Sequence, residues 1–443
     1  MRSKLFPKAF ALAVVPAMVL AGCAASDEAD SETENSDSSS SATNGSTTET
    51  TEISLWYHGA GNEAEKAQID TITTDFNTSQ SDYEVVIQEF PQNSYNDSVV
   101  AAAAANDLPC ILDVDGPIMP NWAWAGYMQP LTSIDPERED AVLSGAKGYY
   151  DGELYSIGLW DAALGMLANK SALDDNGIRI PTVDNPWTGQ EFDSALETLQ
   201  ATGDYEHVLD LGTNLTGEWY PYAYSPFLQS HGGDLIDRES LETAEGVLNG
   251  AAAVEFGEWW QNLFESGYAS PQEPGERGRF AEGDVPLQWN GNWDAPKNAE
   301  ALGDDFVVLP PPDFGNGPAI GAASWQFGVS ASCENPEGAE AWIDHALQDE
   351  YLTGFSNTIG LVPATAQAAA DSDLYFEGSQ FEIFVELSDQ FGVIRPATPA
   401  YPVISKEFEK ALADIRDGKD VQAALDAAVD AIDADLAANN FYE

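Results

Sequence analysis

Aromatic side chains stand beside polar ones at several points where strands are expected to end or to turn. Trp160 is followed by Asp161, Asn290 lies three residues before Trp293, and Asp115 comes directly before a Gly-Pro pair. An indole ring can stack on the weakly apolar face of a sugar, while carboxylates and amides bond its hydroxyl groups in fixed geometry. Residues of these types therefore could form a carbohydrate-binding site.

Each of these residues also has a structural interpretation. Trp293 could be a core tryptophan, and Trp160 could pack where the chain crosses between two parts of the fold. Asp115 could simply turn the chain before Gly-Pro. The sequence leaves these alternatives open.

A second group of candidates lies near other turns and crossings. His58 and Asn62 flank a glycine-containing turn before an expected helix, whose first N–H groups have no partner within the helix. His58 could equally be an exposed turn residue, and Arg395 could simply pair with one of the many carboxylates. The other members of this group are Trp219, Tyr220, Trp325 and Tyr401.

The elements that must position these residues alternate between strand and helix. Residues 53–57, 83–90 and 111–114 are expected strands, with a helix after residue 62 and an alanine-rich helix before Leu108. Such a β-α-β-α-β order predicts a largely parallel sheet covered by helices. Ligands bind such sheets at the carboxyl ends of the strands, which here deliver His58 and Asp115.

The rest of the chain continues in the same manner. Strands are expected over residues 306–309 and 325–330, and helices over 189–201, 254–264, 339–347 and, broken at Gly418, over 406–436. These patterns predict an α/β fold.

The N-terminus has the features of a secretion signal. Arg2, Lys4 and Lys8 are followed by an apolar run over residues 9–20, which is too short to cross a hydrocarbon layer of about 30 Å as a helix. The run ends in Leu-Ala-Gly-Cys23, which resembles the bacterial lipoprotein signal. We expect residues 1–23 to be a signal peptide with a lipidated Cys23, and the acidic, Ser/Thr-rich residues 24–51 to be a disordered tether.

The chain is strongly acidic, with 75 Asp and Glu residues against 17 Lys and Arg and a net charge of −58. This balance argues against nucleic acid binding, because phosphate contacts need clustered cations. The acidity is interpreted as a solvated surface rather than a metal-binding wall, since no calcium-loop spacing occurs. Neither a metal nor a cofactor is expected. Cys110 and Cys333 are the cysteines that remain besides Cys23, and an exported protein can join such a pair in a disulfide.

Several of these segments together resemble the extracellular solute-binding proteins of sugar ABC importers. The most specific is Phe280-Ala-Glu-Gly-Asp-Val-Pro-Leu-Gln-Trp-Asn-Gly-Asn-Trp293, which is similar to the family pattern Phe-x-x-Gly-x-x-Ala-x-x-x-x-Gly-x-Trp but has Pro286 in place of the alanine. Residues 154–160 leading to 167–170 look like the family's crossover between lobes. Residues 399–405 with the following helix match a third segment.

The resemblance implies two α/β lobes, each with a mainly parallel sheet, that close on a ligand by hinge bending. The first lobe would hold residues 52–158 and 327–373, and the second residues 159–326 and 374–443. The resemblance also implies that Trp293 stacks on the ligand and that Trp219 or Tyr220 contacts it.

The function that follows from the resemblance is capture of a di- or oligosaccharide by a monomer without catalytic activity. The protein would stand at the outer face of the cytoplasmic membrane, held by its lipid, and deliver the sugar to the permease subunits of an ABC importer. A secreted glycoside hydrolase is the alternative from another class, because aromatic rings and paired carboxylates also build such sites. The same fold with a polyamine, phosphate ester or peptide as ligand is a third.

Overall fold

A computed structural model describes residues 50–60, 63–272, 279–323 and 325–442 of the chain. Two of the residues predicted to be functional, Cys23 and Asn62, lie outside the described residues. The signal peptide and nearly all of the predicted tether lie outside them as well.

The larger of the two main sheets has a mixed arrangement of strands. Its strand order is β2-β1-β3-β13-β6-β5, and the short β4 pairs with β13. The β1 strand is parallel to β2 and β3, whereas β13 is antiparallel to β3 and β6. The strands are β1 (Thr51–Ala60), β2 (Tyr83–Pro91), β3 (Ile111–Asp115), β4 (Met128–Gln129), β5 (Lys147–Tyr150), β6 (Glu153–Ile157) and β13 (Trp325–Ser330).

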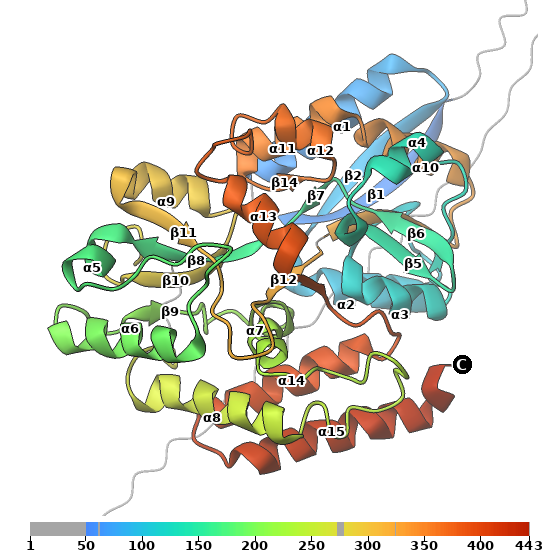
Figure 1. The fold of residues 1–443 in the computed structure, drawn as a ribbon. Coiled ribbons are helices and arrows are strands. Elements are labelled where there is room, and N and C mark those ends of the chain that lie inside the picture. Colours follow the sequence, from blue (N-terminus) through green and yellow to red (C-terminus); the bar gives the residue numbers. More distant parts are fainter. Residues whose placement is uncertain (1–49, 61–62, 273–278, 324, 443) are drawn as a thin grey trace, which may run out of the picture. The chain divides into compact units, whose positions relative to one another are not determined.

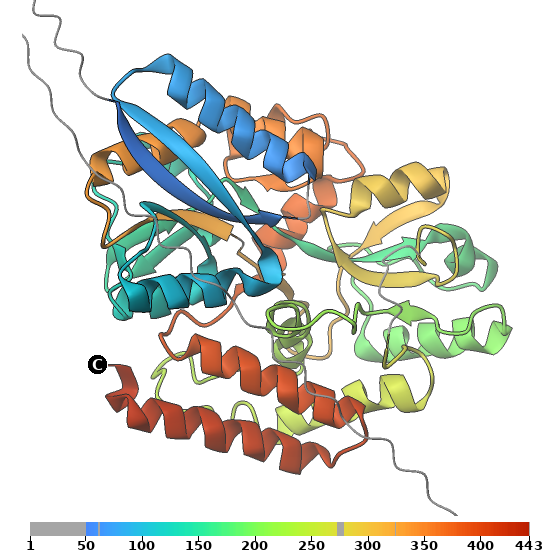
Figure 2. The ribbon, with the colours of Figure 1, turned by 180° about the vertical axis from the view of Figure 1, so that it is seen from behind.

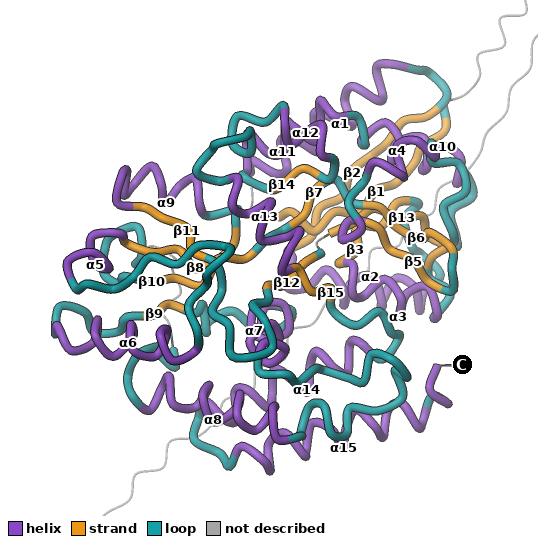
Figure 3. Tube along the Cα trace, in the orientation of Figure 1, coloured by secondary structure: helices purple, strands orange, loops and turns teal. Residues whose placement is uncertain are grey.

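The second sheet has the strand order β11-β8-β10-β9. The β8 strand is antiparallel to both of its neighbours, and β9 is parallel to β10. The strands are β8 (Leu164–Asn169), β9 (Leu209–Asp210), β10 (Leu287–Gly291) and β11 (Phe306–Leu309). Figure 3 shows the two groups of strands as separate orange clusters.

Two short ribbons lie on the segments that connect these sheets. One pairs β7 (Trp160–Asp161) with β14 (Val362–Pro363), and the other pairs β12 (Ile320–Ala322) with β15 (Gly392–Ile394). Along the chain, β7 follows β6 of the first sheet and precedes β8 of the second. In the same way, β12 follows β11 of the second sheet and precedes β13 of the first. The chain thus passes between the sheets at both ribbons. The predicted lobe limits near residues 158, 326 and 373 stay a prediction.

Helices cover both sheets. Figure 2 shows α1 lying along β1 and β2, while α7, α8, α14 and α15 pack together beside the second sheet (Figure 1). Their bounds are α1 (Glu63–Ser79), α2 (Gln92–Ala105), α3 (Met119–Trp124), α4 (Pro136–Ala141), α5 (Lys170–Asp175), α6 (Gly189–Thr202), α7 (Trp219–Ser230), α8 (Ala251–Glu265), α9 (Ala295–Leu302), α10 (Pro336–Ala346), α11 (Asp349–Ile359), α12 (Ala366–Ala370), α13 (Glu382–Phe391), α14 (Tyr401–Arg416) and α15 (Val421–Ala438). Short 3-10 turns are η1 (Gly116–Ile118), η2 (Ser144–Ala146), η3 (Gly303–Asp305) and η4 (Asn440–Tyr442).

Local sequence signals explain several helix ends. Thr188 and Glu191 form a reciprocal capping box at the start of α6, which satisfies N–H groups that the helix leaves unpaired. At the start of α15, the side chain of Asp420 accepts a hydrogen bond from the backbone N–H of Ala423. Gly418, with a φ of 90°, separates α14 from α15 and adopts a backbone conformation that other residues rarely reach.

The α/β class and the β-α-β-α-β start of the fold are confirmed, but two details of the prediction are wrong. The sheets are mixed rather than mainly parallel, because β13 and β8 enter their sheets antiparallel to their neighbours. The chain also does not turn after Tyr57. The β1 strand continues through Ala60, where its pairing with Pro91 of β2 shifts register.

A disulfide joins Cys110 to Cys333, 223 positions apart in the chain. It links the residue before β3 to the segment after β13, two neighbouring strands of the first sheet. The predicted pairing of these two cysteines is therefore present in the structure.

Candidate ligand-binding site

Arg395 lies at the centre of the candidate site, directly after β15. Its Nη2 donates to Oδ1 of Asp115 at 3.1 Å, and its Nη1 donates to Oε2 of Glu218 at 2.9 Å. Asp115 ends β3 of the first sheet, whereas Glu218 precedes α7 beside the second. One guanidinium, only 4 % exposed, therefore connects the two halves of the fold.

Glu218 receives further hydrogen bonds from α14. The hydroxyl of Tyr401 donates to its Oε2 at 2.6 Å, and the hydroxyl of Ser405 donates to its Oε1. Burial raises the pKa of Glu218, and Arg395 and these hydroxyls only partly offset the effect. The carboxylate is thus held in place by one cation and two hydroxyls.

Three aromatic rings gather beside Arg395 on the side of the second sheet. The ring of Trp293 lies 6.3 Å from those of Trp219 and Tyr222, centroid to centroid, and the Trp219 and Tyr222 rings are 6.2 Å apart. The guanidinium carbon of Arg395 stands 5.1 Å above the Tyr222 ring. Trp219 and Trp293 are half-buried, so part of each ring can receive a ligand.

Two rings of this aromatic wall, those of Trp219 and Tyr222, are hydrogen-bonded to backbone carbonyls. The Tyr222 hydroxyl donates to the Ala162 carbonyl at 2.6 Å, and Nε1 of Trp219 donates to the Leu211 carbonyl at 3.1 Å. These bonds fix the orientation of the rings. In contrast, Nε of Arg395 is buried and has no acceptor among the described residues.

Trp325 and His58 lie on the side of the first sheet. Trp325 is opposite Asp115 in the antiparallel pairing of β13 with β3, so both side chains leave the same face of the sheet. The imidazole of His58 stacks on the Trp325 ring with centroids 3.6 Å apart and planes 8° apart. His58 is 5 % exposed and belongs to a strand, which excludes the alternative that it is an exposed turn histidine.

Trp160 and Asp161 lie in the β7 ribbon rather than beside Arg395. Trp160 is 2 % exposed and packs on Phe355, with ring centroids 4.6 Å apart. Asp161 accepts N–H bonds from Ala162 and Ala323 at 3.0 and 3.1 Å and a bond from the hydroxyl of Ser388. Burial raises the pKa of Asp161, and these bonds only partly offset that rise. Both residues thus fasten the connection between the sheets.

Tyr220 and Asn290 also point into the protein. Tyr220 is 2 % exposed, and its hydroxyl accepts a bond from Arg416 of α14 at 2.9 Å. The side chain of Asn290 donates to Asp294 at 2.7 Å. The structure therefore brings together Asp115, Trp219, Trp293, Arg395 and Tyr401, with His58 behind Trp325, but not Trp160, Asp161, Tyr220 or Asn290.

Sequence reasoning missed Glu218 and Tyr222 as individual site residues. Both belong to the stretch Glu218-Trp-Tyr-Pro-Tyr222, in which the family resemblance points to Trp219 or Tyr220. Side chains three or four positions apart share one face of a helix. Because α7 begins at Trp219, the helical period places Tyr222 rather than Tyr220 beside Trp219.

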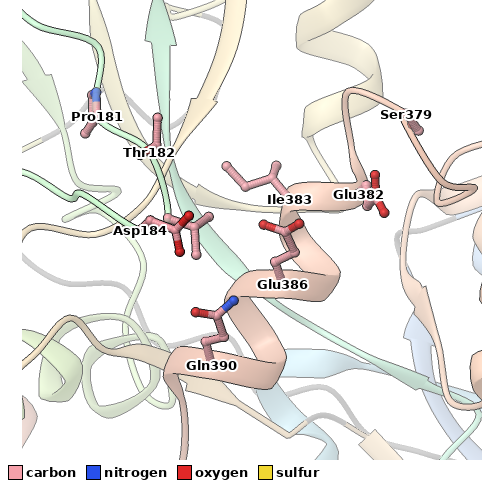
Figure 4. Close-up of a pocket in the computed structure, with 9 residues that line it drawn as sticks. Pro181, Thr182, Asp184, Ser379, Glu382, Ile383, Glu386 and Gln390 are labelled. Carbon is pink, nitrogen blue, oxygen red and sulfur yellow. The ribbon is translucent and has the colours of Figure 1, made fainter.

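A pocket of about 460 Å³ lies elsewhere, between residues 181–184 and α13 (Figure 4). Asp184, Glu382 and Glu386 contribute carboxylates to its wall, and among the described residues none that lines it is aromatic. A sugar ring would find no stacking surface there. The pocket is therefore a weaker candidate than the residues around Arg395.

Within the part of the chain that the structure describes, no helix combines the length and apolar character needed to cross a membrane. The same residues contain no cluster of three or more His, Cys, Asp or Glu side chains arranged to hold a metal ion.

Comparison with known proteins gives a consistent result. Residues 71–380 match the family model of bacterial extracellular solute-binding proteins. An uncharacterised lipoprotein of Streptomyces antibioticus is 22 % identical over 317 residues, which are 68 % of each chain. A maltodextrin-binding protein of Bacillus subtilis is 23 % identical over 234 residues, covering 50 % of this chain and 53 % of the relative.

The fold is also found among solved structures. A receptor of Streptomyces glaucescens, determined unliganded and in complex with acarbose and an acarbose homologue, superimposes with a TM-score of 0.74. The match covers 89 % of this chain and all of the receptor, at 19 % sequence identity. Two-lobed sugar-binding proteins therefore share this fold.

Proposed function

Because the chain belongs to the family of bacterial extracellular solute-binding proteins, we propose that it captures a di- or oligosaccharide between its two sheets and delivers it to the permease of an ABC importer. The lipid on Cys23 holds it at the outer face of the cytoplasmic membrane. Neither role involves catalysis by this chain.

The observation that carries the proposal is the meeting of three aromatic rings with a buried guanidinium. Trp219 and Trp293 are half-buried and can present π-faces of the kind that stack on sugar rings, with the buried ring of Tyr222 beside them. Beside these rings, Asp115 and Arg395 supply a carboxylate and a guanidinium, groups that bond sugar hydroxyls when the site opens to a ligand. Several rings in one place favour a ligand with more than one sugar unit.

The names of the relatives point to the same chemistry. The Bacillus subtilis relative is a maltodextrin-binding protein, and the Streptomyces glaucescens receptor was solved with acarbose. We therefore place a glucose-based oligosaccharide first among the ligands to test.

The binding experiment is calorimetry with the full chain carrying Cys23→Ser, which prevents lipid attachment. We expect acarbose or maltotriose to bind with a Kd of about 1 μM or tighter, equivalent to about −8 kcal/mol, and to change tryptophan fluorescence. Spermidine and glucose 1-phosphate test the rival ligands. Binding of one of them in place of any glycan would overturn the sugar proposal, as would release of reducing sugar by the protein.

The anchor is tested separately in cells. Wild-type protein should incorporate labelled palmitate and remain with the membrane, whereas Cys23→Ser protein should appear in the medium. Equal membrane retention of the two proteins without label would refute the lipid anchor and leave the binding proposal intact.

A further inference from the structure

A buried histidine lies behind the tryptophan on the first-sheet side of the candidate site. His58 of β1 bonds Asp113 of β3 twice, because both its backbone N–H, at 3.3 Å, and its ring Nδ1 contact Oδ2 of Asp113. On the other side of the ring, Nε2 lies 3.7 Å from Oε1 of Glu65 in α1. Asp113 is fully buried, so this carboxylate has no bulk water to solvate it.

The imidazole is also in parallel contact with an indole. The centroids of the His58 and Trp325 rings are 3.6 Å apart and the ring planes are nearly parallel, and Tyr95 of α2 meets the Trp325 ring edge-on at 5.7 Å. His58 therefore covers one face of Trp325, and Tyr95 limits its rotation. Trp325 itself remains half-buried and stands opposite Asp115, the partner of Arg395.

We propose that His58, held by Asp113, is a positioning residue for the Trp325 ring, and that protonation of its imidazole strengthens sugar binding at this site. This inference rests on the proposed function, because it concerns the affinity of the same site. His58 does not touch the ligand. It acts through the ring on which it stacks.

The two protonation states of His58 interact differently with Trp325. A protonated imidazole adds a cation–π attraction to the stacking, and a desolvated contact of this kind is strong. The neutral ring loses that attraction and leaves the buried Asp113 without a cationic partner. The indole is therefore held more firmly when His58 carries a proton.

The groups around His58 determine where it titrates. Burial alone lowers the pKa of His58, but the carboxylates of Asp113, Glu65 and Asp115 outweigh this effect and raise the pKa above its ordinary value. Protonation, and the tighter binding that depends on it, should be complete below about pH 6.5 and be lost as the pH rises through the raised pKa. The side chains that face the ring are Tyr57 of β1, Glu65 of α1, Tyr95 of α2, Asp113 and Asp115 of β3 and Trp325 of β13.

The first test measures glycan affinity by calorimetry from pH 6 to pH 9.5, with acarbose and maltotriose as probes. We expect wild-type affinity to fall about five-fold across this range, the factor that a partly desolvated cation–π contact supplies. His58→Gln should bind weakly and equally at all pH values. A second variant, His58→Gln with Asp113→Asn, removes the unpaired carboxylate and should show the same flat profile.

His231 provides a matched control. It also stacks on an aromatic ring, that of Phe314, with centroids 4.2 Å apart, but it follows the end of α7 opposite to Trp219. His231→Gln should retain the wild-type pH profile. A flat profile in the wild type, or equal profiles in wild type and His58→Gln, would overturn the proposal.

The second test observes His58 directly in the wild-type chain. The chain has only four histidines, so their ring protons can be followed individually by NMR. The His58 signal should move when Trp325 is replaced by Phe, and saturating glycan should raise its titration midpoint by about 0.7 pH unit, since a five-fold coupling is reciprocal. An unchanged midpoint would contradict the proposal even if glycan binds. Failure of both glycans to bind at any pH would instead reject the proposed function, and this inference with it.

Discussion

The two sides of the candidate site consist of different types of residue. On the side of the second sheet, Trp219, Tyr222 and Trp293 form a neutral aromatic wall. On the side of the first sheet, Trp325 is backed by His58, and Asp115 is paired with Arg395. Backbone carbonyls bond Trp219 and Tyr222 in the aromatic wall, whereas charged groups hold the residues on the side of the first sheet.

Because of this difference, the two sides should contribute differently to the pH and salt dependence of ligand binding. A neutral aromatic wall contributes contact area that changes little with pH or salt, whereas paired charges respond to both. Arg395 joins the sides, since it bonds Asp115 and also stands over Tyr222. The predictions below test this division, from the largest expected effect to the smallest.

Replacing Arg395 with Met should have the largest effect. The change leaves Asp115 and Glu218 facing each other without a cation, and breaking a buried ion pair in this way costs about 3–5 kcal/mol. Urea unfolding of the variant should show this loss at pH 7.5. The loss should be smaller at pH 5, because burial raises the pKa of Glu218 and its protonation relieves the repulsion.

Arg179→Met is the control for this variant. Arg179 pairs with Glu191 at the surface, with side chains 36 and 46 % exposed, and such pairs contribute about 0–1 kcal/mol. If the two variants lose equal stability, Arg395 is not the central connection between the two sides.

Removal of the disulfide should weaken the first sheet. Cys110 and Cys333 close a separation of 223 residues beside β3 and β13, and loss of such a crosslink typically costs about 2–5 kcal/mol. Replacing both cysteines with Ala should lower the unfolding free energy by this amount, and hydrogen exchange should increase most in β3 and β13. Dithiothreitol should destabilise the wild type and leave the double variant unchanged. Equal exchange in both sheets would show that the crosslink does not act locally.

Trp293→Ala tests the aromatic wall. Loss of a central stacking ring typically costs about 2 kcal/mol of binding energy, or about 30-fold in Kd. Calorimetry with acarbose or maltotriose should show this reduction at every pH. Trp259→Ala is the matched control, because Trp259 is also half-buried but lies in α8 and bonds Asp193. Its removal should leave affinity unchanged.

Asp161→Asn should have the smallest effect. The pKa of Asp161 is raised by burial, so the folded state holds its proton more tightly than the unfolded state does. Stability is therefore lost as the pH rises from the ordinary value near 4 through the raised pKa. The neutral Asn can still accept the N–H bonds of Ala162 and Ala323, and we expect a gain of about 1 kcal/mol at pH 7 that vanishes near pH 3. A loss at pH 7 would show that the charge itself holds the connection.

Local patterns predicted most of the elements. The expected helix over 189–201 is α6 at Gly189–Thr202, and the tail divides at Gly418 into α14 and α15 as expected. These segments carry their own capping residues and apolar periodicity. The antiparallel entry of β13 beside β3 could not be predicted in the same way, because Val329 and Ile111 meet across more than two hundred residues.

For the site, the sequence indicated the kinds of residues but not all of their positions. Trp293 and Trp160 both stand next to polar residues, yet Trp160 is packed on Phe355 while Trp293 is half-buried beside Tyr222. The two surroundings look alike in sequence because each follows a short strand. Only the neighbours in space distinguish a core tryptophan from one that borders a site.

By itself, the sequence determined the α/β class, the order of the elements and the aromatic and polar character of the candidate site, since these depend on periodicity and residue type. The tertiary structure decided which charges meet. Arg395 is 280 positions from Asp115 and 177 from Glu218, and no local pattern marks that Arg395 pairs with both. The tertiary structure also decided the position of His58. The pairing of β1 with β2 continues past this residue, so it lies in a strand rather than a turn, and Asp113 of the neighbouring strand bonds its ring beneath Trp325.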